Sequence, residues 1–204
     1  MIINDFVAKY QRDFIEMVQS VSVTDIQASN IKMDEAITQI VNELVAVSER
    51  GNKLIFVGNG GSAAIASHMA LDFWKNCGVK ATAFNDSSLL TALANDYSYD
   101  EVFSKSIETF AERGDMLMAI SSSGNSKNIV NASIAARKLG CTIATFSGFS
   151  KDNALIATGD WNFYLPSQSY GYCETIHAYL IHVILDAKLY CNEGIDIFHK
   201  NQKL

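Results

Sequence analysis

The sequence has few basic residues, no long apolar run and no export signal. Its 16 Lys and Arg are outnumbered by 22 Asp and Glu, so the formal net charge is -6. Nucleic acids and anionic membranes are bound chiefly through Lys and Arg, so this charge argues against such partners. No apolar run reaches about 18 residues, and the N-terminus has no basic segment followed by an apolar one. We therefore expect a soluble, cytoplasmic protein.

Closely spaced cysteine pairs are also absent. The four cysteines are scattered, which fits reduced thiols better than a disulfide framework, and most are expected to be small core residues. They are Cys77, Cys141, Cys173 and Cys191. At 204 residues and 49% hydrophobic, the chain can bury one full core. We expect a single domain over residues 1–204, with a helical N-terminal arm over residues 1–50.

One stretch, residues 54–72, predicts a strand, a glycine turn and a helix. Its start, Leu54 to Val57, is apolar and too short for a helix. The segment Gly58-Asn59-Gly60-Gly61 tolerates positive φ and can turn backbone N–H groups outward. Ser62 stands where a helix N-cap is expected, and a helix N-terminus favours a phosphate through its free N–H groups and dipole. This turn therefore predicts an anion cradle.

The helix after the glycine turn carries His68 and Asp72, four residues apart and so on one face. Alone, such a pair is more often a surface ion pair than a functional one. Its place behind an anion cradle favours a metal site or an acid–base pair beside a bound phosphate.

Strands and helices alternate along the rest of the chain, which predicts a parallel sheet. Two long helices are expected between Asp5 and Glu49. With 54–57, further strands at 80–84, 116–120, 141–146 and 161–165 make five, and further helices are expected at about 89–95, 101–112, 128–139 and 173–191. The expected fold is three-layer α/β, with a five-stranded parallel sheet flanked by helices and preceded by N-terminal helices.

A second cradle is expected at Ser121-Ser122-Ser123-Gly124-Asn125-Ser126, between the strand at 116–120 and the next helix. Ligands of parallel sheets bind beyond the carboxyl ends of the strands, so both cradles should open on one edge. The last helix carries Glu174, His177 and His182. We expect a packing or hydrogen-bonding role for His177 and a solvated side chain for His199.

The strand ending in Gly-Asn-Gly-Gly-Ser, the strand ending in Ser-Ser-Ser-Gly-Asn-Ser, and the late Glu-Thr-Ile-His followed by His182 together resemble the sugar isomerase (SIS) domain. Within it, the phosphoheptose isomerases are the most similar. The resemblance covers nearly the whole chain. It implies the SIS fold and conversion of D-sedoheptulose 7-phosphate to D-glycero-D-manno-heptose 7-phosphate through an enediol, for the heptoses of lipopolysaccharide, capsule or other surface glycans. It also implies zinc or another divalent cation, and a homotetramer with active sites between subunits.

The resemblance also implies roles for individual residues. Catalysis falls on Asp72 and His182, and the metal ligands on His68, Asp72, Glu174 and His182. The substrate contacts are Asn59, Gly60, Gly61, Ser62, Asp72, Asn95, Asp96, Ser121, Ser122, Ser123, Ser126 and Glu174. Asp72 stands where the family has Glu, and Glu174 where it has Gln.

Glu174 and His182 would lie about 12 Å apart along a continuous helix, too far for one ion to bind both from one chain. Either the helix breaks near Glu174, or neighbouring subunits complete each site. We favour the second explanation.

Other functions fit parts of the pattern. A non-catalytic SIS protein, like the tetrameric factor that binds the bacterial replication initiator, would need no metal site. An isomerase of another sugar phosphate would share the cradles. The run from Gly58 to Ala63 also matches the dinucleotide fingerprint, with Asp86 as the ribose-binding acid, but Asp86 follows Gly58 by 28 residues rather than about 20.

Overall fold

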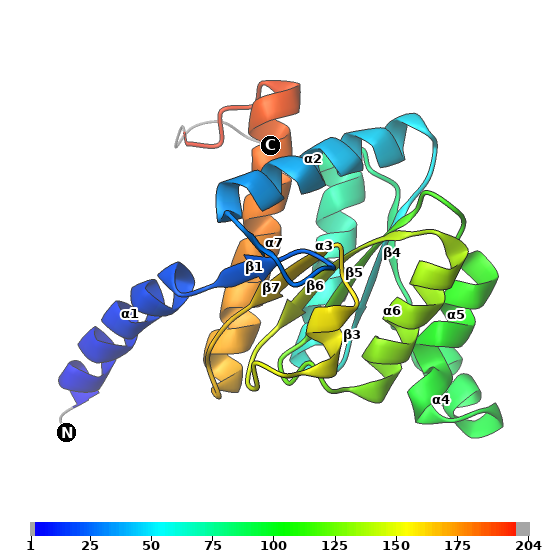
Figure 1. Cartoon of the computed structure of the whole chain (residues 1–204), viewed down its shortest axis with the longest axis horizontal. Coiled ribbons are helices and arrows are strands. Elements are labelled where there is room, and N and C mark those ends of the chain that lie inside the picture. The colour runs from blue at the N-terminus through cyan, green and yellow to red at the C-terminus, as the bar shows by residue number, and fades with distance from the viewer. Residues whose placement is uncertain (1–2, 199–204) are drawn as a thin grey trace.

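The computed structural model describes residues 3–198, so His199 and its expected solvation lie outside the described residues. The described chain alternates helices and strands as expected (Figure 1). Its elements are α1 (Ile3–Gln19), β1 (Ser22–Thr24), β2 (Asn30–Ile31), α2 (Met33–Glu49), β3 (Leu54–Gly58), α3 (Gly61–Cys77), β4 (Ala81–Ala83), α4 (Ser87–Asp96), the 3-10 helix η1 (Tyr99–Glu101), α5 (Val102–Phe110), β5 (Met116–Ser121), α6 (Lys127–Leu139), β6 (Thr142–Ser147), the 3-10 helix η2 (Ala154–Ala157), β7 (Trp161–Tyr164) and α7 (Tyr170–Glu193).

The strands form one sheet in the order β2-β1-β7-β6-β5-β3-β4. The five strands from β7 to β4 are parallel, which confirms the predicted parallel sheet. Two short strands at the β7 edge, β1 and β2, pair antiparallel and were not predicted. They have three and two residues, too few to show the alternation that identifies a strand in sequence.

Helices cover both faces of the sheet, so the three-layer arrangement is also confirmed. Neighbouring strand residues point to opposite faces: Phe56 packs with α2, α3 and α7, whereas Val57 packs with α5 and α6. Both are fully buried, because a parallel sheet covered on both faces has no solvent side. The helices and strands thus form one layered body in which α3 and α7 lie side by side (Figure 1).

The helical N-terminal arm divides into two parts. The helix α2 packs on the sheet, whereas α1 extends away from the body (Figure 1). The C-terminal half of α1 contacts the core through Phe14, Met17 and Val18. Its N-terminal half exposes Phe6 and Val7.

The cysteines behave as expected. All four are free; three are buried and Cys191 is exposed. Burial raises the pKa of the Cys173 thiol to about 11, so it stays protonated at neutral pH. Within residues 3–198, no helix is both long and apolar enough to cross a membrane.

Candidate active site

The two cradles form one pocket. Gly58 at the end of β3 pairs with Ile120 near the end of β5, so the loops after these neighbouring strands open side by side. The chain order reverses here, since β4 lies on one side of β3 and β5 on the other, which is where open α/β sheets bind ligands. The pocket has a volume of about 210 Å³ and is lined by Asn59, Gly60, Gly61, Ser62, Ile120, Ser121, Ser122, Ser123, Ser126, Tyr170 and Glu174.

The glycine turn leaves the N-terminus of α3 open. Gly60, with φ of 55°, is the N-cap residue, and no side chain of the described residues caps this helix. The expectation that Ser62 is the N-cap is therefore wrong: the N-cap lies two residues earlier, at Gly60, because glycine adopts this backbone easily. By contrast, α4 has a side-chain cap, since the Asp86 carboxylate accepts from the backbone N–H groups of Ser88 and Leu89. The uncapped N–H groups of α3 are thus available to an anion in the pocket.

The serine loop leaves a second helix end open. Ser126 is the N-cap residue of α6, but its hydroxyl makes no capping bond and instead accepts from the Ser121 hydroxyl at 3.3 Å. The loop is held from behind at Gly124, where a Cβ would collide with the Asn153 side chain. Asn153 is itself buried and donates to the Ser150 carbonyl at 2.8 Å. Hydroxyls and free N–H groups therefore meet in a loop of fixed shape.

Glu174 lies in this pocket, away from the other expected metal ligands. A Cβ on Gly61 would collide with its carboxylate, so the side chain lies directly against the start of α3. The helix α7 is continuous from Tyr170 to Glu193, so a break near Glu174 is excluded. Glu174 therefore cannot join His182 at one ion within this chain.

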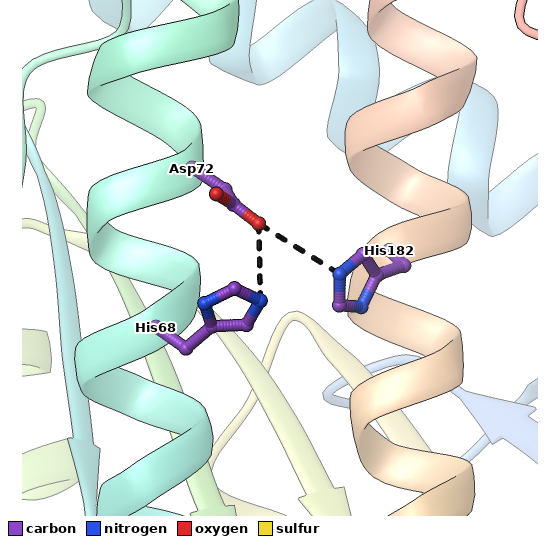
Figure 2. Close-up of side chains that lie close together, drawn as sticks. All are labelled: His68, Asp72 and His182. Carbon is purple, nitrogen blue, oxygen red and sulfur yellow. Dashed lines mark ion pairs between the residues drawn. The ribbon is translucent and has the colours of Figure 1, made fainter.

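The other three expected ligands do come together (Figure 2). His68 Nε2 lies 3.2 Å from Asp72 Oδ2, and His182 Nε2 lies 3.8 Å from the same oxygen. The first two come from α3 and the third from α7. One ligand atom from each lies within 4.8 Å of the others, which suits coordination of one cation. The cluster is open to solvent, with His68 58% exposed and His182 41%.

The hydrogen bond at the back of His182 determines its tautomer. Its Nδ1 lies 2.9 Å from the Ala178 carbonyl, which can only accept, so Nδ1 carries the proton. Nε2 then turns its lone pair toward the Asp72 carboxylate. Both atoms therefore present lone pairs to the same space, which suits a shared cation. Two imidazoles and a carboxylate are a donor set found in catalytic zinc sites.

Pocket and cluster lie along one seam between α3 and α7. Gly61 faces Glu174 at one end, and the cluster joins His68 and Asp72 to His182 further along, so the two helices run parallel. Seven residues separate Gly61 from His68, which is about 10 Å along the helix. The anion pocket and the cluster are thus separate sites along the same pair of helices.

Other expected site residues lie elsewhere. Asn95 and Asp96 line a separate shallow hollow on α4 with Ser87, Ser88, Thr91 and Ala92, so this chain does not bring them to the pocket. Asp86, the acid of the dinucleotide interpretation, is the cap of α4, and its backbone hydrogen bonds to Leu89 and Ser88 lower its pKa. Its position at a helix cap removes the main support for that interpretation.

Two residues that line the pocket, Ile120 and Tyr170, were not predicted as site residues. Tyr170 lines the pocket at the start of α7 and packs edge-on against Phe149. Tyr170 could have been predicted from the sequence. The strand before Pro166 ends at the same sheet edge as the two cradles, so the helix that follows it begins near them.

His177 has the expected structural role. It is fully buried, and its Nε2 donates to the Ser147 carbonyl at 3.2 Å. Burial lowers its pKa to about 4, so it stays neutral at physiological pH.

Comparisons with known proteins agree with this geometry. The family model described as SIS domain matches residues 14–148. The phosphoheptose isomerase of Thermodesulfovibrio yellowstonii is 37% identical over 153 residues, covering 72% of this chain and 76% of the relative. That of Shewanella oneidensis is 36% identical over 183 residues, covering 85% and 89%. The solved phosphoheptose isomerase from Neisseria gonorrhoeae superposes with a TM-score of 0.77 at 28% identity, covering 91% of this chain and 99% of that one.

The chain therefore belongs to the SIS-domain family, and within it to the phosphoheptose isomerases. This membership confirms the resemblance inferred from the three sequence motifs.

Proposed function

We propose that this protein is a cytoplasmic aldose–ketose isomerase that converts D-sedoheptulose 7-phosphate to D-glycero-D-manno-heptose 7-phosphate for surface-glycan heptoses. One observation carries the proposal: an anion pocket with two uncapped helix ends and a His–Asp–His cluster lie along the same pair of helices. The pocket suits the phosphate, and the cluster suits proton transfer. The names of the curated relatives support the choice of substrate.

The reaction moves a proton from C1 to C2 while another passes between the two oxygens. A base removes the C1 proton, the electrons form the enediol, and the proton returns at C2. Asp72 and His182, 3.8 Å apart, supply the base and the acid. In this tautomer the lone pair of His182 is on Nε2, the atom that faces Asp72.

We further propose that His68, Asp72 and His182 bind one divalent cation, zinc in the first instance. When bound by these residues, such an ion would supply Lewis-acid polarisation of the substrate carbonyl. Removal of metal by a chelator should abolish turnover, and zinc should restore it. Mass spectrometric metal analysis should find about one ion per chain, and His68→Ala should lose it. An unchanged metal content in His68→Ala would contradict this site.

We also propose a homotetramer whose active sites lie between subunits. Glu174 cannot reach the cluster of its own chain, whereas the exposed cluster can accept a ligand from another copy. The exposed apolar side chains of α1 offer a surface for that contact, which supports a place for the N-terminal arm in the interface.

Incubation of zinc-loaded protein with sedoheptulose 7-phosphate, followed by proton NMR, tests the function. We expect the aldose signals to appear with the wild type and to be lost in His182→Ala. Turnover of another sugar phosphate instead would keep the reaction and change the substrate. If no sugar phosphate reacts, the non-catalytic SIS binding protein becomes the better explanation.

A further inference from the structure

The side-chain amide of Asn59 is held by two residues that do not line the pocket. Asn59 Nδ2 donates to Asn128 Oδ1 at 2.8 Å, and Asn128 Nδ2 donates back to Asn59 Oδ1 at 3.0 Å. The Tyr99 hydroxyl donates to the same Asn59 oxygen at 3.0 Å. The amide of Asn59 is therefore paired with that of Asn128 and is fixed by a third hydrogen bond, from Tyr99.

These bonds leave one group of Asn59 free. A carboxamide offers two lone pairs on oxygen and two N–H groups. The oxygen accepts from both Asn128 and Tyr99, and one N–H donates to Asn128. Within the described part of the chain, the second N–H has no protein partner. Because Asn59 lines the pocket, this N–H is a donor for an oxygen bound there.

The two partners come from different parts of the fold. Asn128 lies in the first turn of α6, behind the serine loop, and is only 2% exposed. A buried amide in this position needs its hydrogen bonds, so the pair is rigid. Tyr99 lies on η1 with an exposed side chain, and its hydroxyl donates to Asn59. Asn128 thus joins the serine loop to the glycine turn at a fixed distance.

We propose that Asn128 and Tyr99 are positioning residues for Asn59, fixing its amide so that the free N–H donates to an oxygen of the sugar phosphate. This inference rests on the proposed function for its substrate. It adds two residues to the site that do not touch the ligand themselves.

Asn128→Asp tests the pairing with little change in shape. The new carboxylate still accepts from Asn59 Nδ2, but it repels Asn59 Oδ1 instead of donating to it. We expect the KM for sedoheptulose 7-phosphate to rise about 10- to 100-fold, with kcat changed less than about threefold, because a donor to a charged group is lost far from the proton-transfer cluster. The control Ser133→Ala removes a buried hydroxyl on the same helix that bonds only to the Ile129 carbonyl, and it should keep the wild-type KM.

Tyr99→Phe removes the hydroxyl that donates to Asn59 Oδ1, and it should raise KM about threefold to tenfold. Its control is Tyr97→Phe, which removes an exposed hydroxyl two residues away and should change neither constant. A merely structural role for Asn128 would lower the active fraction, so kcat would fall and KM would stay constant. That result, or a wild-type KM in Asn128→Asp, would overturn the proposal.

A second readout separates this proposal from the proposed function. In nitrogen-15 NMR, inorganic phosphate should shift the side-chain amide signals of Asn59 in the wild type and in Ser133→Ala, but not in Asn128→Asp. This result would support the positioning role even if the wild type isomerised no heptose phosphate. Equal shifts in Asn128→Asp, or no shift in the wild type, would overturn it.

Discussion

Asp72 is the residue on which the His–Asp–His cluster depends, since one of its oxygens faces both histidines. Asp72→Asn keeps the shape but removes the charge and the base. We expect kcat to fall about 10²- to 10⁴-fold, with little change in the melting temperature, because Asp72 is partly exposed and both histidines that it faces are open to solvent. The exposed Asp152→Asn is the matched control and should behave as wild type. An Asp72→Asn enzyme with wild-type kcat would contradict the assigned role.

His177 should make the protein less stable in acid. Its folded pKa of about 4 lies below the unfolded value near 6.5, so the unfolded chain binds a proton that the folded chain excludes. The free energy of unfolding should therefore fall as pH drops from about 6.5 to 4, by on the order of 3 kcal/mol from this group. His177→Gln, which can still donate to the Ser147 carbonyl, should lose that part of the slope. Urea unfolding at pH 7 and pH 4.5 measures it, and an identical slope in both proteins would refute the assignment.

At the site, residues whose partners lie one helical turn away could be predicted from sequence, and those with distant partners could not. His68 and Asp72 could be paired from sequence because four residues is one helical turn. The joining of His182 to them came from the family resemblance, since no local spacing links residues of α3 and α7. Asn128 was missed because its partner Asn59 is 69 residues away and the pair carries no motif.

At the scale of elements, the open start of α3 depends on Gly61. Gly61→Ala would force the Glu174 carboxylate aside, and the flexible side chain rather than the backbone would move. Alanine is the better helix residue, so the melting temperature should not fall. We expect kcat/KM to drop about 10- to 100-fold, because the displaced Glu174 carboxylate changes the shape of the pocket. Gly171→Ala, in the first turn of α7, adds the same methyl group with more space and serves as the control. Equal activity of the two variants would show that Glu174 does not shape the pocket.

Element types were predictable, and their ends were less so. The five parallel strands were found because each is a short apolar run followed by turn residues. The strands β1 and β2 depend on pairing with the edge strand β7, which no local pattern reports. The helix α7 begins at Tyr170 rather than near Cys173, because Ser169 is its N-cap. Ser169 is one of several polar residues before the helix, so its capping role was not recognised from sequence.

At the scale of the whole molecule, α1 carries an apolar face that residues 3–198 leave exposed. Phe6 is 50% exposed and Val7 47%. If that face packs on another copy, the double variant Phe6→Asp and Val7→Asp should convert a tetramer to smaller species in light scattering coupled to size exclusion. Glu16→Lys, an exposed charge change on the same helix, should not. A double variant that elutes like the wild type would exclude α1 from the interface.

Isomerisation of sedoheptulose 7-phosphate through an enediol is tested most directly by running the reaction in deuterated water. A base that exchanges its proton with solvent places deuterium at C2 of the aldose, whereas a direct hydride shift does not. We predict that proton NMR will show the aldose with deuterium at C2, formed about 10²- to 10⁴-fold more slowly by Asp72→Asn. Unlabelled aldose would contradict the enediol route. No aldose from the zinc-loaded wild type would contradict the enzyme itself.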